Sequence, residues 1–174
     1  GDPLEGPALE INQAADEAIA RYSFIDGTRQ CAGGASYGGH RANWMQASTD
    51  RYRCLISHAG LINLESQWAT SDVTYSREQN MGGPPWQQGV DWDTQNPIRY
   101  ASRWRTPVLV TVGERDFRVP MNNTLEYWSV LQRQQVESRL LVFPDENHWI
   151  LQGENSRQFF NEVHDWLARW LKAQ

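Results

Sequence analysis

Short apolar runs alternate with amphipathic stretches along most of the chain. The apolar runs predict four strands, at residues 30–34, 53–59, 106–114 and 138–144. The run at 53–59 is almost continuously apolar, which is typical of a strand covered on both faces. Pro107 begins the third run and Pro144 closes the fourth, so the pattern favours short, buried strands with defined ends.

Amphipathic stretches predict helices at residues 8–21, 40–47, 122–135 and 156–171. The last is the clearest, because its apolar positions follow the i, i+3, i+4 spacing of one helix face: Phe159, Phe160, Val163, Trp166, Leu167, Trp170 and Leu171. We expect Asn122 or Asn123 to cap the third helix and Ser156 to cap the fourth. Alternating strands and helices predict one α/β domain, with about four mostly parallel strands flanked by helices.

The segment at residues 61–105 interrupts this pattern. It contains four tryptophans and several glycines and prolines, with few periodic stretches. We expect it to be irregular, and long irregular segments inside compact domains tend to be functional. The alternative for most of its tryptophans is simple hydrophobic packing.

Composition excludes several classes of protein. The 174 residues are enough for one domain, and the net charge of −5, with no cluster of Lys or Arg, argues against nucleic-acid binding. No apolar run approaches the roughly 18 residues of a membrane span, so we expect a soluble protein of the cytoplasm or periplasm. Cys31 and Cys54 form neither a disulfide framework nor a metal site, and we expect two buried free thiols and no metal or cofactor.

The stretch GGASYGG at residues 33–39 surrounds Ser36 with glycines. Residues 34–38 match the G-x-S-x-G pattern and lie between an expected strand and an expected helix, where this pattern forms a sharp turn that projects the serine hydroxyl. We expect side chains two residues before and two after the serine to collide, which explains Gly34 and Gly38. The alternative is a glycine-rich turn without chemistry.

A nucleophilic serine needs a base, and the chain has four histidines. His148 lies in a loop just after the fourth expected strand, where it can reach the serine. His40 follows the elbow on a helix and is expected at the solvent or rim, and His58 ends an apolar strand as a satisfied core residue. His164 lies in the last helix. His148 is therefore the candidate base.

The third group that a nucleophilic serine needs is a carboxylate that orients the histidine. Asp116 lies in the loop after the third expected strand, whereas Glu114 follows that strand so closely that it has less reach. The order Ser36, Asp116, His148, with each residue just beyond a strand, is the chain order of the α/β-hydrolase arrangement. Parallel strands would bring all three to one edge of the sheet.

With these residues in place, the chain resembles the catalytic domain of the prolyl oligopeptidase family of serine peptidases, and most of all its dipeptidyl and acylaminoacyl peptidases. The resemblance runs from about Leu9 to Leu171 and rests on FIDGTRQCAGGASYGGHRANW, on NPIRYASRWRTPVLVTVGERDFRVP and on LLVFPDENHWI. It implies hydrolysis of peptide bonds, with Ser36 as nucleophile, Asp116 as orienting acid and His148 as general base.

The resemblance also implies a substrate pocket. Tyr37 would give its backbone amide to the oxyanion hole and its ring to the pocket for the residue before the scissile bond. Val119 and Arg118 would approach the same pocket, and the tryptophan-rich segment at 61–105 would cover the site.

The family's first strands, its β-propeller or similar domain and its second oxyanion donor have no counterpart in these 174 residues. We therefore expect the C-terminal half of an α/β-hydrolase fold, inactive alone, with an exposed sheet edge that needs the N-terminal part of the same protein or a second copy. Two alternatives stay open: an esterase or lipase of the same fold, and a non-catalytic interaction fragment.

Overall fold

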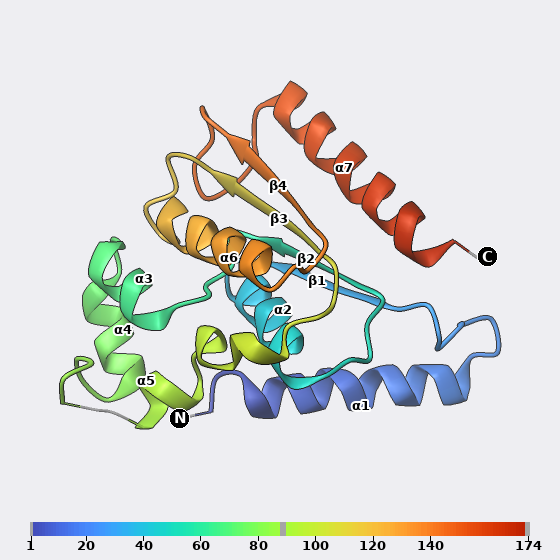
Figure 1. The fold of residues 1–174 in the computed structure, drawn as a ribbon, viewed down its shortest axis with the longest axis horizontal. Coiled ribbons are helices and arrows are strands. Elements are labelled where there is room, and N and C mark those ends of the chain that lie inside the picture. Colours follow the sequence, from blue (N-terminus) through green and yellow to red (C-terminus); the bar gives the residue numbers. More distant parts are fainter. Residues whose placement is uncertain (1, 88–89, 173–174) are drawn as a thin grey trace.

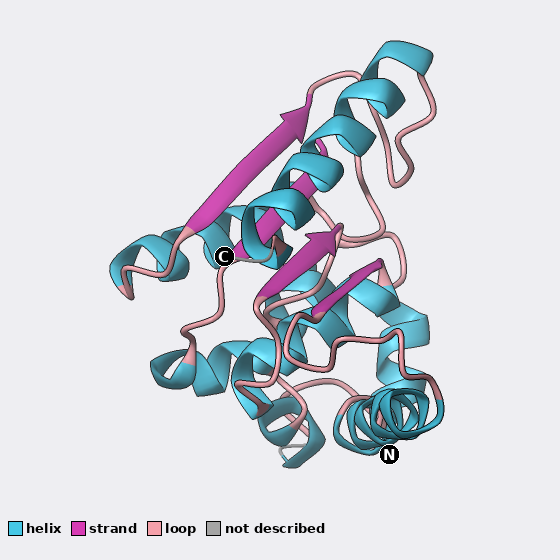
Figure 2. Cartoon of the chain, turned by 90° about the vertical axis from the view of Figure 1, so that its right-hand side faces the viewer, coloured by secondary structure: helices cyan, strands magenta, loops and turns pink. Residues whose placement is uncertain are grey.

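Four parallel strands form the centre of the molecule. In the computed structural model, which describes residues 2–87 and 90–172, they lie in the order β1-β2-β3-β4. Figures 1 and 2 show their arrows side by side and pointing the same way. Their bounds are β1 Cys31–Ala35, β2 Cys54–His58, β3 Val108–Gly113 and β4 Ser138–Phe143. The expected α/β fold with parallel strands is confirmed, and all four carboxyl ends share one edge.

Helices cover both faces of this sheet. The helices α1 (Glu5–Arg21), α2 (Tyr37–Ser48) and α6 (Met121–Arg133) lie on one side, and α7 (Gly153–Leu171) lies on the other (Figure 1). No helix within the described ranges is long and apolar enough to cross a membrane.

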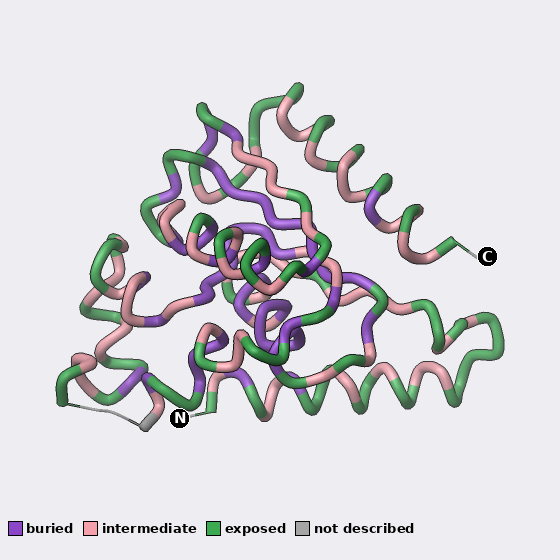
Figure 3. Tube along the Cα trace, viewed as in Figure 1, coloured by how far each residue is buried: buried purple, intermediate pink, exposed green. Residues whose placement is uncertain are grey.

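The alternation of side chains along the strands divides the core between the two faces. Leu55, Val108 and Val110 pack with Trp44 of α2 and Tyr127 of α6. On the opposite face, the strand residues Cys54 and Leu109 pack against Trp166 of α7. Figure 3 shows the resulting buried centre, with exposed outer faces on α1 and α7. The strands are therefore the middle of three layers.

The segment between β2 and β3 is more regular than its sequence suggests. It holds α3 (Leu64–Thr70), α4 (Thr74–Met81), α5 (Val90–Thr94) and the 3₁₀ helix η1 (Pro97–Arg103). Each has eight residues or fewer, which is about two turns and too short for a repeating apolar stripe. Trp92 and Trp104 are buried, as simple packing predicts, whereas Trp86 is exposed.

Two expected helix caps differ in the structure. Pro120, not an asparagine, precedes α6, and the Asn123 side chain instead accepts hydrogen bonds from the backbone N–H groups of Ile62 and Asn63. The last helix begins at Gly153, three residues before Ser156, so Ser156 lies inside its first turn. Sequence pattern located these helices correctly, but contacts from distant segments determine how they begin.

The free cysteines lie opposite one another on neighbouring strands. Cys31 of β1 is the register partner of Cys54 of β2, and both thiols are free. Cys54 is buried, as expected, but Cys31 is only partly buried because β1 is an edge strand. The neighbouring Cys54 thiol and burial together raise the pKa of Cys31, so the Cys31 thiol stays protonated at neutral pH.

Trp166 joins α7 to the sheet, since its ring is buried and its Nε1 donates to the Leu55 carbonyl at 3.1 Å. We expect Trp166→Ala to lower the free energy of unfolding by about 3–5 kcal/mol, through lost burial and the cavity left behind. Trp166→Phe should cost less, about 1 kcal/mol for the lost hydrogen bond. Urea unfolding monitored by circular dichroism measures both, with the exposed Phe160→Ala of the same helix as control. An equal loss for Trp166→Ala and the control would contradict this docking.

Candidate active site

Ser36 lies at a sharp turn between β1 and α2. Its φ of 56° is in the left-handed region that non-glycine residues rarely adopt, so the turn is strained as the sequence motif predicts. Its backbone N–H donates to the His58 carbonyl of β2 at 2.9 Å, and its hydroxyl makes no capping bond to α2. The elbow is thus held through its backbone, and its hydroxyl is not used by the helix.

Two of the glycines around Ser36 are sterically required. A Cβ on Gly34 would meet the backbone of Gly38, with its oxygen 2.5 Å away. A Cβ on Gly39 would lie 2.7 Å from the His58 carbonyl oxygen and 2.8 Å from Gly60 Cα. A Cβ on Gly38, however, meets no atom of the described chain within 4 Å apart from its chain neighbours and the backbone of its own helix. The expected collision is therefore found two residues before the serine but not two residues after it.

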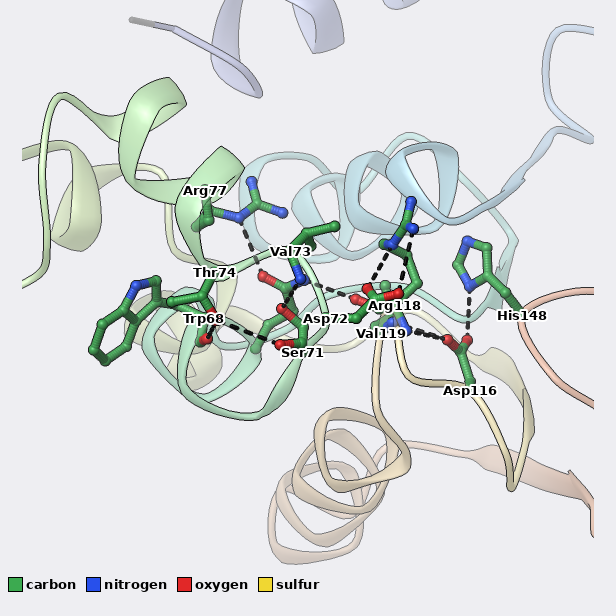
Figure 4. Close-up of polar contacts among 11 residues, drawn as sticks. Trp68, Ser71, Asp72, Val73, Thr74, Arg77, Asp116, Arg118, Val119 and His148 are labelled. Atoms are coloured by element: carbon green, nitrogen blue, oxygen red, sulfur yellow. Dashed lines mark hydrogen bonds and ion pairs between the residues drawn. The ribbon is translucent and has the colours of Figure 1, made fainter.

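Asp116 and His148 are in direct contact. His148 Nδ1 lies 2.7 Å from Asp116 Oδ2, and the Asp116 side chain is fully buried (Figure 4). The other carboxylate oxygen, Oδ1, accepts the backbone N–H groups of Arg118 and Val119, each at 2.9 Å. An ionised carboxylate only accepts hydrogen bonds, so His148 carries its proton on Nδ1 and leaves Nε2 free as an acceptor.

The loops that carry these two residues approach closely at Gly113. A Cβ there would collide with the Asn147 carbonyl and would lie 2.6 Å from the Glu146 carbonyl oxygen. The same Glu146 carbonyl accepts the Arg115 N–H at 2.9 Å. Glycine at the end of β3 therefore permits the loop contact that brings Asp116 to His148.

Glu146 holds the His148 loop from inside, a role that the sequence pattern did not indicate. Its buried carboxylate accepts the backbone N–H groups of Leu151 and Gln152 and the Asn155 side-chain amide. Burial pushes the pKa of Glu146 up, but these hydrogen bonds together outweigh it and leave the pKa below its usual range. Glu146 thus supports the start of α7 and the loop before it. An acidic residue shortly before an apolar helix was the only available signal.

His58 links the elbow to the His148 loop. Its backbone carbonyl binds Ser36, and its ring Nε2 lies 3.2 Å from the His148 carbonyl oxygen. A carbonyl only accepts, so Nε2 donates and Nδ1 accepts from the Thr111 hydroxyl at 2.8 Å. Burial lowers the pKa of His58 despite these contacts, so the ring is neutral near pH 7. His58 is satisfied and buried, as expected, and it also positions both loops.

Ser36 and His148 each contact His58, Ser36 through the His58 carbonyl and His148 through the His58 ring. Within the described chain no hydrogen bond joins the Ser36 hydroxyl to His148, whereas Asp116 and His148 are already paired. Ser36 instead lines a pocket of about 80 Å³ together with the other three expected pocket residues, Tyr37, Arg118 and Val119. The structure therefore brings the six expected site residues together as two groups at the same sheet edge.

The Arg118 side chain is held at the surface of this site. Its Nε donates to Asp72 Oδ1 at 2.8 Å and its Nη2 to Asp72 Oδ2 at 3.3 Å (Figure 4). This pairing raises the pKa of Arg118 and lowers that of Asp72. Both side chains are about half exposed, so the pair orients Arg118 more than it stabilises the fold.

His40 differs from its expected place at the solvent or rim. It is 1% exposed, because the helix turn after the elbow faces inward against the segment after β2. Burial, with a smaller effect of the Arg77 charge, lowers the pKa of His40 to about 3. His40 lines the same pocket as Ser36, and its Nε2 is buried without a hydrogen-bond partner in the described structure.

The fold and these loops define a class of protein. A parallel sheet with a strand–serine–helix elbow, and an aspartate and a histidine after later strands, is the arrangement of the α/β-hydrolases. A family model described as the prolyl oligopeptidase family matches residues 7–174. The chain belongs to this family, and the resemblance found in the sequence is confirmed.

Relatives agree with this assignment. The chain is 38% identical over 164 residues to dipeptidyl-peptidase 5 of Porphyromonas gingivalis, covering 91% of this chain and 24% of that protein. It is 34% identical over 168 residues to dipeptidyl-peptidase 5 of Schizosaccharomyces pombe, covering 95% and 25%. The chain thus spans about a quarter of the length of these relatives.

A solved structure shares the fold. Acylaminoacyl peptidase of Pyrococcus horikoshii superposes with a TM-score of 0.89 at 21% identity, covering 96% of this chain and 28% of that one. The four-stranded arrangement therefore corresponds to one part of a larger peptidase structure.

The glycine contacts predict unequal effects of adding one methyl group. We expect Gly34→Ala and Gly39→Ala to lower the midpoint of urea unfolding strongly, since each methyl group meets backbone atoms that cannot move aside. Gly38→Ala should be tolerated or slightly stabilising, because alanine in a helix is favoured over glycine by up to about 1 kcal/mol. Three similar midpoints would show that the elbow is not packed in this way.

Burial of His40 predicts a pH-dependent stability. Its folded pKa of about 3 lies below the ordinary value of 6.5, so the unfolded chain binds the additional proton. The contribution is complete above pH 6.5 and is lost as the pH falls towards 3, by up to about 1.4 kcal/mol per pH unit. His40→Leu should flatten the curve of unfolding free energy between pH 6.5 and 5.

The slope that remains in His40→Leu should come largely from His58, whose pKa is also lowered. His164→Gln, which removes an exposed imidazole from α7, is the matched control. An unchanged slope in His40→Leu, measured by urea unfolding at each pH, would contradict the buried, neutral state of His40.

Proposed function

We propose that this chain carries the catalytic residues of a serine peptidase that cleaves short peptides through an acyl-enzyme. The observation that carries the proposal is the Asp116–His148 contact of 2.7 Å, at the sheet edge where the strained Ser36 elbow also lies. Membership of the prolyl oligopeptidase family supports peptide bonds, rather than lipid or other esters, as the substrate class.

In this mechanism Ser36 Oγ attacks the peptide carbonyl carbon and gives its proton to His148 Nε2. The protonated imidazole then donates that proton to the leaving amine as the C–N bond breaks, which leaves an ester on Ser36. Water, deprotonated by His148, hydrolyses the ester and restores the serine. Asp116 keeps the imidazole in the tautomer with its proton on Nδ1 and stabilises its charged form.

The first amide of α2, from Tyr37, would donate to the oxyanion that forms on the carbonyl oxygen, where the helix N-terminus also favours negative charge. The pocket of about 80 Å³ beside Ser36, with Tyr37, Arg118 and Val119 in its wall, would receive the side chain of the residue before the scissile bond. Binding there would place the carbonyl next to Ser36.

The free edge of β1 would pair with a further strand, from elsewhere in the same protein or from a second copy. The other side of β1 has no strand neighbour among the described residues. A cavity of about 570 Å³, which contains neither Asp116 nor His148, runs along this edge between α1 and α2. An unpaired edge next to an open cavity is a place where another chain segment can add. Such a segment would complete the sheet. It would also bring the two groups of site residues into contact with each other.

A fluorophosphonate probe, which reacts with activated serines, tests the assignment. We expect the full-length protein to be labelled, and Ser36→Ala to abolish labelling because it removes the nucleophile. Asp116→Asn should slow labelling by about a thousandfold or more, since the wrong tautomer of His148 cannot accept the proton. Ser102→Ala, which removes an exposed hydroxyl from η1, is the matched control.

The same probe applied to this 174-residue chain tests whether it is inactive alone. Labelling that depends on Ser36 would show that the site assembles without further strands. Absence of labelling from both the full-length protein and this chain would refute the peptidase proposal, and faster turnover of matched esters with no amide turnover would favour an esterase.

A further inference from the structure

The pocket beside Ser36 combines apolar and polar side chains in its wall. Besides the residues used above, it is lined by the apolar Leu61 and Val73 and by the polar side chains of His40, Gln67 and Arg77. Its volume of about 80 Å³ equals between two and three water molecules at ~30 Å³ each. It therefore fits a short side chain, and its polar groups determine which one.

Arg77 is held in place by a short chain of hydrogen bonds. Its Nε donates to Gln67 Oε1 at 3.1 Å, and Gln67 Nε2 donates to the Arg118 carbonyl at 2.8 Å. Gln67 is 1% exposed, so it links Arg77 rigidly to the loop that follows Asp116. Figure 4 shows Arg77 and Arg118 along one row of polar contacts that ends at the Asp116–His148 pair.

The guanidinium of Arg77 has no carboxylate partner within the described ranges. The nearby acids bind elsewhere: Asp72 pairs with Arg118, Glu78 accepts the Trp68 indole N–H at 2.9 Å, and Asp2 accepts the Gly6 N–H at 2.8 Å. Burial lowers the pKa of Arg77, which means that its charged form is incompletely solvated. A partly buried cation without a counter-charge is costly, and an arriving anion would remove that cost.

His40 adds a second unsatisfied group to the same pocket. It is fully buried, its Nε2 has no partner, and its pKa of about 3 keeps it neutral at physiological pH. A neutral imidazole can donate one hydrogen bond to a carboxylate without bringing a second charge. An unpaired buried donor or acceptor costs about 1–3 kcal/mol, so a ligand that pairs with it binds more tightly than one that does not.

We propose that this pocket selects substrates with a short acidic residue, aspartate above all, immediately before the scissile bond. Arg77 is the charge partner of the carboxylate, His40 donates to its second oxygen, and Leu61, Val73 and Val119 contact the methylene group. The inference rests on the proposed function, because it needs Ser36 to act on the carbonyl of the residue that occupies the pocket.

The test compares substrates that differ in one side chain. The full-length protein is assayed with Gly-Xaa-7-amido-4-methylcoumarin, with free and acetylated N-termini, where Xaa is Asp, Asn, Ala or Phe. We expect kcat/KM for Asp to exceed that for the isosteric Asn by about tenfold or more, since only Asp supplies a charge to Arg77. Phe should be the poorest, because its ring exceeds the pocket.

Variants of Arg77 test whether this residue causes the preference for Asp. Arg77→Gln should lower kcat/KM for the Asp substrate by about tenfold or more relative to its effect on the Ala substrate, and an unchanged midpoint of urea unfolding shows that the variant folds. Arg77→Lys should retain part of the preference through its charge. Arg133→Gln removes an exposed positive charge from the last turn of α6 and should change neither substrate.

The outcomes separate this inference from the proposed function. Equal or faster turnover of Asn than Asp, or an Arg77→Gln loss that is the same for Asp and Ala, overturns the acidic preference. Labelling through Ser36 without cleavage of the Asp substrate overturns only the acidic preference and remains consistent with the proposed serine mechanism. No cleavage of any substrate, together with no labelling through Ser36, overturns both.

Discussion

The buried carboxylate of Asp116 is the interaction on which the site depends. It accepts two backbone N–H groups from its own loop and the Nδ1 proton of His148 from another. A buried charge is tolerated only where such donors replace water, so the carboxylate fixes both loops at once. This contact is possible because the end of β3 is Gly113, where the His148 loop passes too close for any side chain.

His58 extends this framework to the serine. Its carbonyl holds the strained Ser36 backbone and its ring holds the His148 carbonyl, so one residue at the end of β2 contacts both halves of the site. Gly39 lets α2 pack directly against the same His58 carbonyl. Groups that are positioned through backbone contacts lose little freedom when a ligand binds, which would favour the proposed acyl transfer. The site is thus organised by the strand ends rather than by its loops alone.

Much of the fold could be predicted because its signals are local. The apolar runs of β2 and β3, the stripe on α7 and the glycines around Ser36 each depend on residues close together in sequence. The roles of Asn123 and Glu146 could not be predicted in this way, because each binds backbone groups that only folding brings near. The short helices between β2 and β3 were not predicted for a different reason, since helices of about two turns carry no repeating apolar pattern.

The sequence alone determined that Ser36, Asp116 and His148 each follow a strand, and parallel pairing then requires them to share one edge of the sheet. It also determined membership of the family, because its motifs are contiguous. Only the tertiary structure decided that His40 is buried rather than at the rim, and that Arg77 shares its pocket with Ser36. Burial and charge partners depend on how separate segments pack, and no spacing along the chain reports that packing.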